Sequence, residues 1–396
     1  MKLGFSEKEQ AFRAEVRAWL TQQMEGPFAH LRGVSFSSHI EERIEWEQHL
    51  AKAGYSVMAW PEQYGGRDAT LAEQVIWAEE YVRAGAPARV NYIGIELAGS
   101  TLRVWGTEAQ KQRFLPALAQ GKELWAQGFS EPGAGSDLAG LRTKATLTTR
   151  PDGRKVWVIE GQKIWTSFAH VADWAFVLCR TEPGSKGGRG VSFMLVPMRQ
   201  PGITVRPIRQ MTSDAEFNEV FFDGAETDEE NVVGPLGEGF KVAMSTLTFE
   251  RGVTTFDTVL HHKEEFRQVI AFARANGKLD DPVTRQKLGE AYAGLRVMEQ
   301  HAWRILSAAE HGKTGAEMLV NKLYFTSWHQ KFMSLALDVI GPEVDYTSDP
   351  ASPYHAFMRK YLFACSDTIY GGTSQIQRNI ISERALGLPR EPKLAA

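Results

Sequence analysis

The spacing of apolar residues changes twice along the chain and divides it into three segments. From Ser6 to about Lys122, apolar positions recur every three to four residues, as in "SEKEQAFRAEVRAWL" and "LAEQVIWAEEYVRAGA". This is the period of an amphipathic helix, and Ser6 with Glu9 forms a capping box at the first helix start. The first segment is therefore predicted to be helical, with one Pro/Gly turn at "AWPEQYGGRDAT".

The middle segment, from about Glu123 to Gly237, has short apolar runs instead. The runs "KVWVIEGQKIWTS", "DWAFVLCRTE", "VSFMLVPM" and "GITVRPIRQ" are rich in Val, Ile, Phe and Trp and are separated by Gly, Pro and Asp. Such runs predict β-strands. The acidic, glycine-broken stretch "DGAETDEENVVGPLGEGF" is predicted to be the loop that closes the segment.

The helical period returns near Phe240 and continues to about Leu388, with one Pro-rich gap, "GPEVDYTSDPASPY", that predicts a surface loop. A β block between two helical segments argues against alternating βαβ units and a doubly wound nucleotide fold. We therefore expect an α+β protein with an N-terminal helical domain (residues 1–122), a β domain (123–237) and a C-terminal helical domain (238–396).

Composition narrows the class of protein without changing this division. The chain has 396 residues, 43% hydrophobic and 23% charged, with a net charge of −3, which is typical of a globular protein without a nucleic-acid partner. It has neither a signal-peptide run nor the roughly 18 apolar residues of a membrane span, so we expect a cytoplasmic protein. Cys179 and Cys365 are predicted to be buried thiols, and no metal site is expected because metal-ligand spacings are missing.

The stretch "DTIYGGTSQIQRNIISERALGLP", near the C-terminal end, predicts a turn followed by the start of a helix. Gly371 and Gly372 allow a close backbone approach, Ser374 with Gln377 forms a capping box, and a Gly and a Pro follow at the end. Free amides at a helix start favour a negative or carbonyl oxygen. Because no acid occurs between Tyr370 and Gln377, the base of any reaction here must lie elsewhere in the chain.

The stretch "WAQGFSEPGAGSDLAGL" contains Ser130, Gly133, Gly135 and Ser136 around one proline. Its spacing is not GxGxxG, so a Rossmann interpretation fails. A loop that cradles a ligand and a simple tight turn both remain open.

A second candidate, "GQKIWTSFAH", places Trp165, Thr166 and Ser167 at the end of a predicted strand. An aromatic plane beside hydroxyl groups suits a flat polar ring, although a tryptophan is also a common core residue.

A conspicuous carboxylate lies in the helical segment that follows the β block. Between Val242 and Leu260 the charged residues are Glu250, Arg251 and Asp257, among apolar and threonine side chains. Glu250 is either half of a structural salt bridge or a general base whose pKa burial raises toward the working pH. Gly252, inside the same helix pattern, favours a close approach by another group.

Four stretches together resemble the acyl-CoA dehydrogenase family: "GFSEPGAGSDLAG", "GQKIWTS", "FERG" and "YGGTSQIQRNIISERALGLP", in this order. The similarity covers nearly the whole chain. It implies a helical N-terminal domain, a β-barrel-like middle domain and a C-terminal four-helix bundle. It also implies FAD-dependent α,β-dehydrogenation of an acyl-CoA thioester to the trans-2-enoyl-CoA, with electrons passed to an electron-transfer flavoprotein.

The resemblance assigns flavin contacts to matching positions on the β segment and after the glycine turn. These positions are Gln127, Phe129, Ser130, Gly135, Ser136, Trp165, Ser167, Thr373 and Gln375. Arg274 matches the flavin contact that a neighbouring subunit makes in this family. This part departs from the family pattern, because "ARANGK" is shorter than the usual Arg-x-x-x-Gly segment and Asp338 and Pro342 replace the usual Gln and Gly.

The catalytic base is also assigned by resemblance. The family's commoner form has a glutamate directly after the turn tyrosine, where this chain has Gly371. In the isovaleryl- and long-chain-type branches the glutamate precedes an arginine on a helix, which Glu250 matches. Arg251, Tyr370 and Gly371 are the implied substrate-binding residues, with the Gly371 amide donating to the thioester carbonyl.

Two alternative functions fit the same resemblance. One is a flavin-dependent oxidase on this fold, and the other is a non-catalytic partner subunit of a heteromeric acyl-CoA dehydrogenase. The expected partners are an acyl-CoA substrate, the electron-transfer flavoprotein, and further copies of the chain in a dimer or tetramer, with a heteromer possible.

Overall fold

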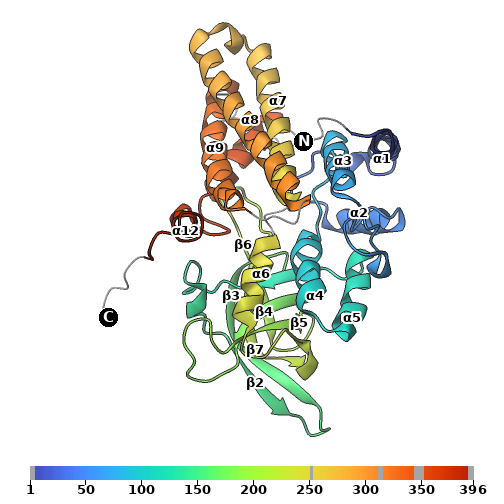
Figure 1. Ribbon diagram of the computed structural model, residues 1–396, viewed down its shortest axis with the longest axis vertical. Coiled ribbons are helices and arrows are strands. Elements are labelled where there is room, and N and C mark those ends of the chain that lie inside the picture. Colours follow the sequence, from blue (N-terminus) through green and yellow to red (C-terminus); the bar gives the residue numbers. More distant parts are fainter. Residues whose placement is uncertain (1–4, 250–252, 311–314, 343–351, 391–396) are drawn as a thin grey trace. The chain divides into compact units, whose positions relative to one another are not determined.

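The computed structural model describes residues 5–249, 253–310, 315–342 and 352–390 (Figure 1). The chain divides into two compact units, one within Phe5–Glu250 and the other within Arg251–Ala396. The described part of the first unit holds helices, then a sheet and one further helix, and that of the second holds helices alone. This order confirms the predicted α+β fold class.

Three of the N-terminal helical segments begin at a side-chain capping box. The N-terminal segments are α1 (Glu7–Glu25), α2 (Ile40–Lys52), α3 (Leu71–Arg83), the π-helical segment Ile93–Gly99, α4 (Ser100–Trp105) and α5 (Glu108–Ala119). The predicted capping box is confirmed: Ser6 Oγ accepts from the Glu9 amide, and the Glu9 carboxylate accepts from the Ser6 amide. Equivalent boxes at Thr70 and Thr107 start α3 and α5. Local polar side chains therefore set three of the helix starts.

The sheet has eight strands in the order β6-β7-β3-β2-β4-β5-β8, with β1 paired in parallel to β4. The strands are β1 (Trp125–Gly128), β2 (Lys144–Thr149), β3 (Lys155–Ser167), β4 (Trp174–Arg180), β5 (Val191–Pro197), β6 (Ile203–Ile208), β7 (Phe217–Asp228) and β8 (Val232–Val233). The four predicted strands are β3 to β6. The prediction that the acidic stretch "DGAETDEENVVGPLGEGF" forms a loop was partly wrong, because its first six residues belong to β7. There Ala225 and Thr227 point inward while Glu226 and Asp228 are more exposed, an alternation that the acidic composition hides.

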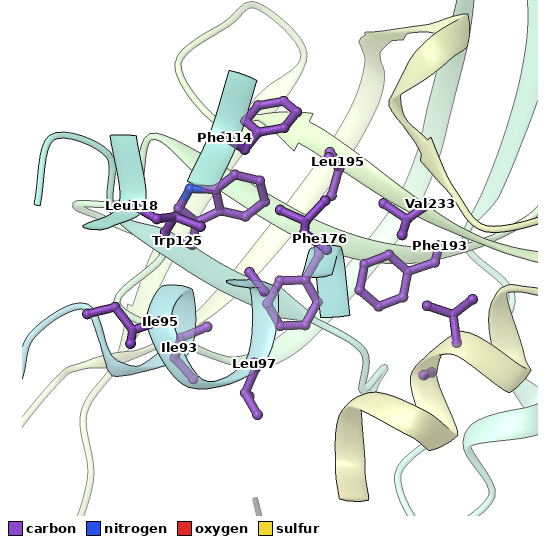
Figure 2. Packing of buried hydrophobic residues seen from close by; sticks show 14 of the residues in the cluster. Ile93, Ile95, Leu97, Phe114, Leu118, Trp125, Phe176, Phe193, Leu195 and Val233 are labelled. Atoms are coloured by element: carbon purple, nitrogen blue, oxygen red, sulfur yellow. The ribbon is translucent and has the colours of Figure 1, made fainter. Parts of the chain in front are cut away.

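A buried apolar cluster joins the sheet to the helices of the first unit and is drawn in Figure 2. Phe176 of β4 and Phe193 of β5 stack with ring centroids 5.3 Å apart, and Trp125 of β1 meets Phe114 of α5 edge-on at 5.3 Å. α6 (Gly239–Phe249) packs on β4 and β5. This cluster fixes β1, and β1 leads directly into the first candidate ligand loop.

The second unit is a helical bundle in which α7, α8 and α9 run alongside one another (Figure 1). Its helices are α7 (Val253–Ala275), α8 (Pro282–Glu310), α9 (Glu317–Ile340), α11 (Pro353–Ala364) and the short α12 (Ser374–Ile380). Cys365 is exposed and only Cys179 is buried, so the prediction of two buried thiols was half wrong. No helix in the described part of the chain combines the length and apolar character needed to cross a membrane.

Candidate functional site

The first candidate site is the loop that follows β1. Phe129 is buried and meets Phe176 edge-on at 5.5 Å, which anchors the root of the loop in the core. Glu131 and Ala134 then exchange two backbone hydrogen bonds of 3.0 Å, closing a small turn around Pro132 and Gly133. The loop is therefore folded on itself before its exposed tip at Gly135 and Ser136.

A buried ion pair holds this loop from inside. Lys163 of β3 is fully buried, and its ammonium lies 2.8 Å from Glu131 Oε1 and donates to the Phe129 carbonyl at 3.2 Å. The Glu131 carboxylate also accepts from the amides of Arg142 and Thr143. Burial by itself would raise the pKa of Glu131, but Lys163 and these donors hold it below its ordinary value. The loop is thus fixed by a fully hydrogen-bonded charge.

Trp165 is displaced from the regular strand by a β-bulge. The pairing of β3 with β7 gains one residue between Lys163 and Thr166, and Trp165 has a φ of 59°. A positive φ is strained for a bulky side chain, and bulges often re-aim residues next to ligand sites. The Trp165 side chain is 55% exposed, so it is not the core residue that a tryptophan commonly is.

The loop and the bulge fit a flavin nucleotide. A Cβ built on Gly133 or Gly135 would meet no atom within 4 Å, so the backbone there is open to a ligand. Among the described residues the amides of Gly135 and Ser136 have no hydrogen-bond partner. Free amides in a glycine-rich loop suit phosphate oxygens, and an exposed indole suits a flat ring.

The second candidate site is the turn at Tyr370–Thr373 in the helical unit. Gly371 and Gly372 have φ values of 61° and 90°, in the region that only glycine adopts readily. The capping residue is Thr373 and not Ser374 as predicted: its hydroxyl accepts from the Ile376 amide at 3.2 Å. Gln377 does not complete a box but donates to the Gly371 carbonyl at 3.1 Å.

α12 covers Ser374–Ile380 and continues directly as the π-helical segment Ile381–Ala385. Within the described chain the amides of Gly371 and Gly372 make no hydrogen bond. The turn therefore presents two free donors.

Behind the turn lies a buried network of charged side chains. His329 of α9 donates to Asp367 Oδ2 at 2.6 Å and lies 3.2 Å from Glu265 Oε2, while Lys360 lies 3.3 Å from the other Glu265 oxygen. Burial lowers the pKa of His329, but its two carboxylate partners outweigh burial and raise it to about 9. His329 is therefore an imidazolium that bridges α7 and the segment before the turn.

Part of this network resembles a metal site in composition. In the described part of the chain, His262, Glu265 and His329 form the one such group, with possible ligand atoms within 4.8 Å of one another. Their carboxylate is already bound by both imidazoles and by Lys360. The cluster is a hydrogen-bonded charge network, and the expectation of no metal remains a prediction.

The other predicted site residues are placed as follows. Gln127 is on β1, Ser130 is partly buried in the loop, Ser167 is buried at the end of β3, and Gln375 is exposed on α12. Arg274 is exposed in the last turn of α7. The predicted base Glu250 and its neighbour Arg251 lie outside the described residues, as does Gly252. Each unit thus carries its own part of the predicted set, and their roles remain predictions.

Sequence reasoning missed the two lysines that organise these sites. Lys163 stands inside "GQKIWTS" on the inward face of an alternating strand, which was a usable signal of a buried charge in need of a partner. Lys322 of α9 donates to the carbonyls of Asp367, Tyr370 and Gly372, in and just before the glycine turn and 45 to 50 residues further along the chain. Only the folded bundle reveals that contact.

Comparisons with known proteins agree along the whole chain. Three domain descriptions match consecutive segments: acyl-CoA dehydrogenase N-terminal domain (residues 6–122), middle domain (126–225) and C-terminal domain (237–386). The acyl-CoA dehydrogenase IpdE1 of Mycobacterium tuberculosis is 48% identical over 386 residues, covering 96% of this chain and 98% of that protein.

Two solved structures share the fold. A structure described as "Tcur3481-Tcur3483 steroid ACAD" has a TM-score of 0.86 and 29% identity and covers 99% of this chain and all of that one. The ChsE4-ChsE5 complex from Mycobacterium tuberculosis gives a TM-score of 0.83, 28% identity and the same coverage. Together with the full-length match to IpdE1, these similarities show that the chain belongs to the acyl-CoA dehydrogenase family of flavoprotein oxidoreductases, which act on CH–CH groups.

Proposed function

We propose that the chain is an FAD-dependent dehydrogenase that introduces an α,β double bond into a bulky, ring-containing acyl-CoA thioester. The turn at Tyr370–Gly372 carries the proposal. It offers free amide donors to a carbonyl oxygen, yet it has Gly371 where the commoner form of the family has its carboxylate. The acid–base group must therefore come from another position, and Glu250 is the residue that matches.

The residues then divide the work of the reaction. The α-proton of a thioester is weakly acidic, so its removal requires both a base and stabilisation of the negative charge that develops on the carbonyl oxygen. Glu250 is proposed to take the proton, and the Gly371 amide to donate to the oxygen. Gln127, Ser130, Ser136, Trp165 and their neighbours are proposed to hold FAD. When bound, FAD supplies the acceptor for the hydride that leaves the β-carbon.

The substrate class and the partners are inferred from relatives. One fold neighbour is described as a steroid ACAD, which supports a polycyclic acyl group in preference to a simple fatty chain. The electron-transfer flavoprotein is proposed as the electron acceptor. Another neighbour, ChsE4-ChsE5, is a complex of two differently named proteins, so a related second chain is a candidate partner beside a second copy of this one.

The test is a turnover screen across straight, branched, dicarboxylic and steroid-derived acyl-CoA thioesters with a dye acceptor, run on the wild type and Glu250→Gln. Loss of a general base typically costs about 10²- to 10⁴-fold, and we expect that loss with the flavin still bound. Glu238→Gln is the control, because Glu238 is exposed just before α6. Near-normal turnover by Glu250→Gln would overturn the assignment.

Two measurements on the same samples separate the alternatives. Oxygen consumption in place of electron-transfer flavoprotein reduction would point to an oxidase. The heteromeric alternative predicts that the purified chain alone neither retains flavin nor turns over any thioester of the screen. A stable yellow homo-oligomer with turnover contradicts it.

A further inference from the structure

Backbone carbonyls in and just before the glycine turn accept hydrogen bonds from side chains of α9 and α12. The Lys322 ammonium donates to the carbonyls of Asp367, Tyr370 and Gly372 at 2.8, 2.6 and 2.9 Å. The intervening Gly371 carbonyl accepts from Gln377 Nε2. Four backbone acceptors between Asp367 and Gly372 are therefore satisfied from the protein side.

Because the carbonyls of Tyr370 and Gly371 are held by hydrogen bonds, the directions of the Gly371 and Gly372 N–H groups follow from peptide geometry. In a trans peptide the carbonyl and the following N–H lie in one plane and point in opposite directions. Lys322 binds the Tyr370 carbonyl, so the Gly371 N–H points away from the ammonium. By the same reasoning the Gly372 N–H points away from Gln377. The left-handed φ of both glycines permits this pair of orientations.

The ammonium also changes the strength of the Gly371 donor. A cation at the oxygen of a peptide group draws electron density from it, and hydrogen bonds in a chain strengthen one another. The Tyr370–Gly371 peptide has its charged partner at 2.6 Å on one side and a free N–H on the other. That N–H is thus a stronger donor than an ordinary backbone amide.

Neighbouring residues fix the position of the turn relative to the Lys322 ammonium. Asp367 is 3% exposed, and its carboxylate accepts from His329 on one oxygen and from the Tyr370 hydroxyl, at 3.1 Å, on the other. The Tyr370 ring lies 5.3 Å from the Lys322 ammonium, within reach of a cation–π contact. The segment from Asp367 to Tyr370 is therefore tied to α9 at several points.

We propose that Lys322 is a positioning residue of the thioester site: it orients the Tyr370–Gly371 peptide and polarises it, so that the Gly371 N–H binds the thioester oxygen more tightly as negative charge develops there. This inference rests on the proposed function and adds a residue to it. Its expected signature is specific to the carbonyl oxygen, because Lys322 is proposed to act through the Tyr370–Gly371 peptide.

The experiment compares the wild-type holoenzyme with Lys322→Met, and with Lys331→Met as the matched control on an exposed position of α9. The probes are 3-cyclohexylpropanoyl-CoA carrying ¹³C at its carbonyl and the thioether 3-cyclohexylpropyl-CoA, which lacks that oxygen. We expect Lys322→Met to lower kcat by about 10- to 100-fold, which is less than the roughly 10²- to 10³-fold loss on removing an oxyanion donor outright, because the Gly371 amide itself remains. Its bound carbonyl stretch should move back toward the free value, while thioether affinity and flavin content stay unchanged.

A purely structural role predicts a different result, with thioether affinity and flavin content falling together with kcat, and this overturns the inference. Should Lys322→Met not fold, Lys322→Gln keeps hydrogen-bond donors without the charge and is expected to show the same reduced carbonyl shift. If the wild type turns over thioesters and Lys322→Met has the same kcat and carbonyl stretch, this inference alone is overturned. A wild type that neither binds nor oxidises any thioester overturns it together with the proposed function.

Discussion

Lys163 and Lys322 each hold a glycine-containing segment in place, but they bind different groups. Each projects from a regular element and fixes a glycine-containing segment that is predicted to contact a ligand. Lys163 is fully buried and pairs with the carboxylate of Glu131, whereas Lys322 is partly buried and binds three neutral carbonyls. The first arrangement is a buried charge pair, so removing one partner is expected to lower the free energy of unfolding. The second holds backbone carbonyls, so its effect falls on the geometry and polarity of the turn.

The largest effect on stability is expected at the buried pair. Lys163→Met leaves the Glu131 carboxylate buried without its cation, and we expect a loss of about 3–5 kcal/mol in the free energy of unfolding, measured by urea denaturation. Adding Glu131→Gln to Lys163→Met should cost less than the sum of the two single changes. Lys144→Met, which breaks an exposed pair with Glu160, should cost about 1 kcal/mol or less. Equal losses for Lys163→Met and Lys144→Met would contradict the distinction.

The charge network behind the glycine turn should make stability depend on pH. Because the folded-state pKa of His329 is raised to about 9 from 6.5, its contribution is fully present below pH 6.5 and is lost as pH rises through 9. That contribution is at most about 3–4 kcal/mol, from ~1.4 kcal/mol per unit of pKa. The measurement is urea unfolding at pH 6, 8 and 10 for the wild type and His329→Gln. The difference between the two proteins should shrink steadily, and a constant difference would refute this account.

A smaller difference in stability is expected between alanine substitutions in the two glycine-containing segments. Gly372→Ala places a methyl group in a backbone with φ 90° and 2.7 Å from Gln377 Nε2, so we expect a loss of about 1–2 kcal/mol. Gly135→Ala, in the open loop of the other unit, should change stability by less than about 0.5 kcal/mol. Both values are measured by thermal unfolding without added ligand. A neutral Gly372→Ala would show that the turn relaxes easily.

Periodicity was sufficient for the elements whose patterns are local. The capping box at Ser6 and the strand over Lys155–Ser167 were predicted from short runs, because helix caps and alternating faces are set by neighbours in sequence. β7 was partly missed, since its acidic outer face gives it the composition of a loop. Propensity alone does not reveal which side of a strand is covered.

The candidate sites were predictable only where a motif concentrates them. Ser130, Gly135 and Ser136 share one loop, and the structure shows that its tip has free backbone amides. The contacts of Lys322 and His329 with Asp367 and with the glycine turn join residues 38 to 50 positions apart, and no periodic signal encodes them. The cap at Thr373 was misplaced by one residue, because two adjacent hydroxyl residues can each serve at a helix start.

The bulge at Trp165 has an optical consequence. The chain has eleven tryptophans, all within the described residues, and Trp165 at 55% is the one that is exposed rather than buried or partly buried. Indoles in contact with water emit at longer wavelengths than buried ones, so excitation at the red edge of the absorption band selects this residue. Its emission is a built-in probe of whatever occupies the space beside β3, with no label introduced into the protein.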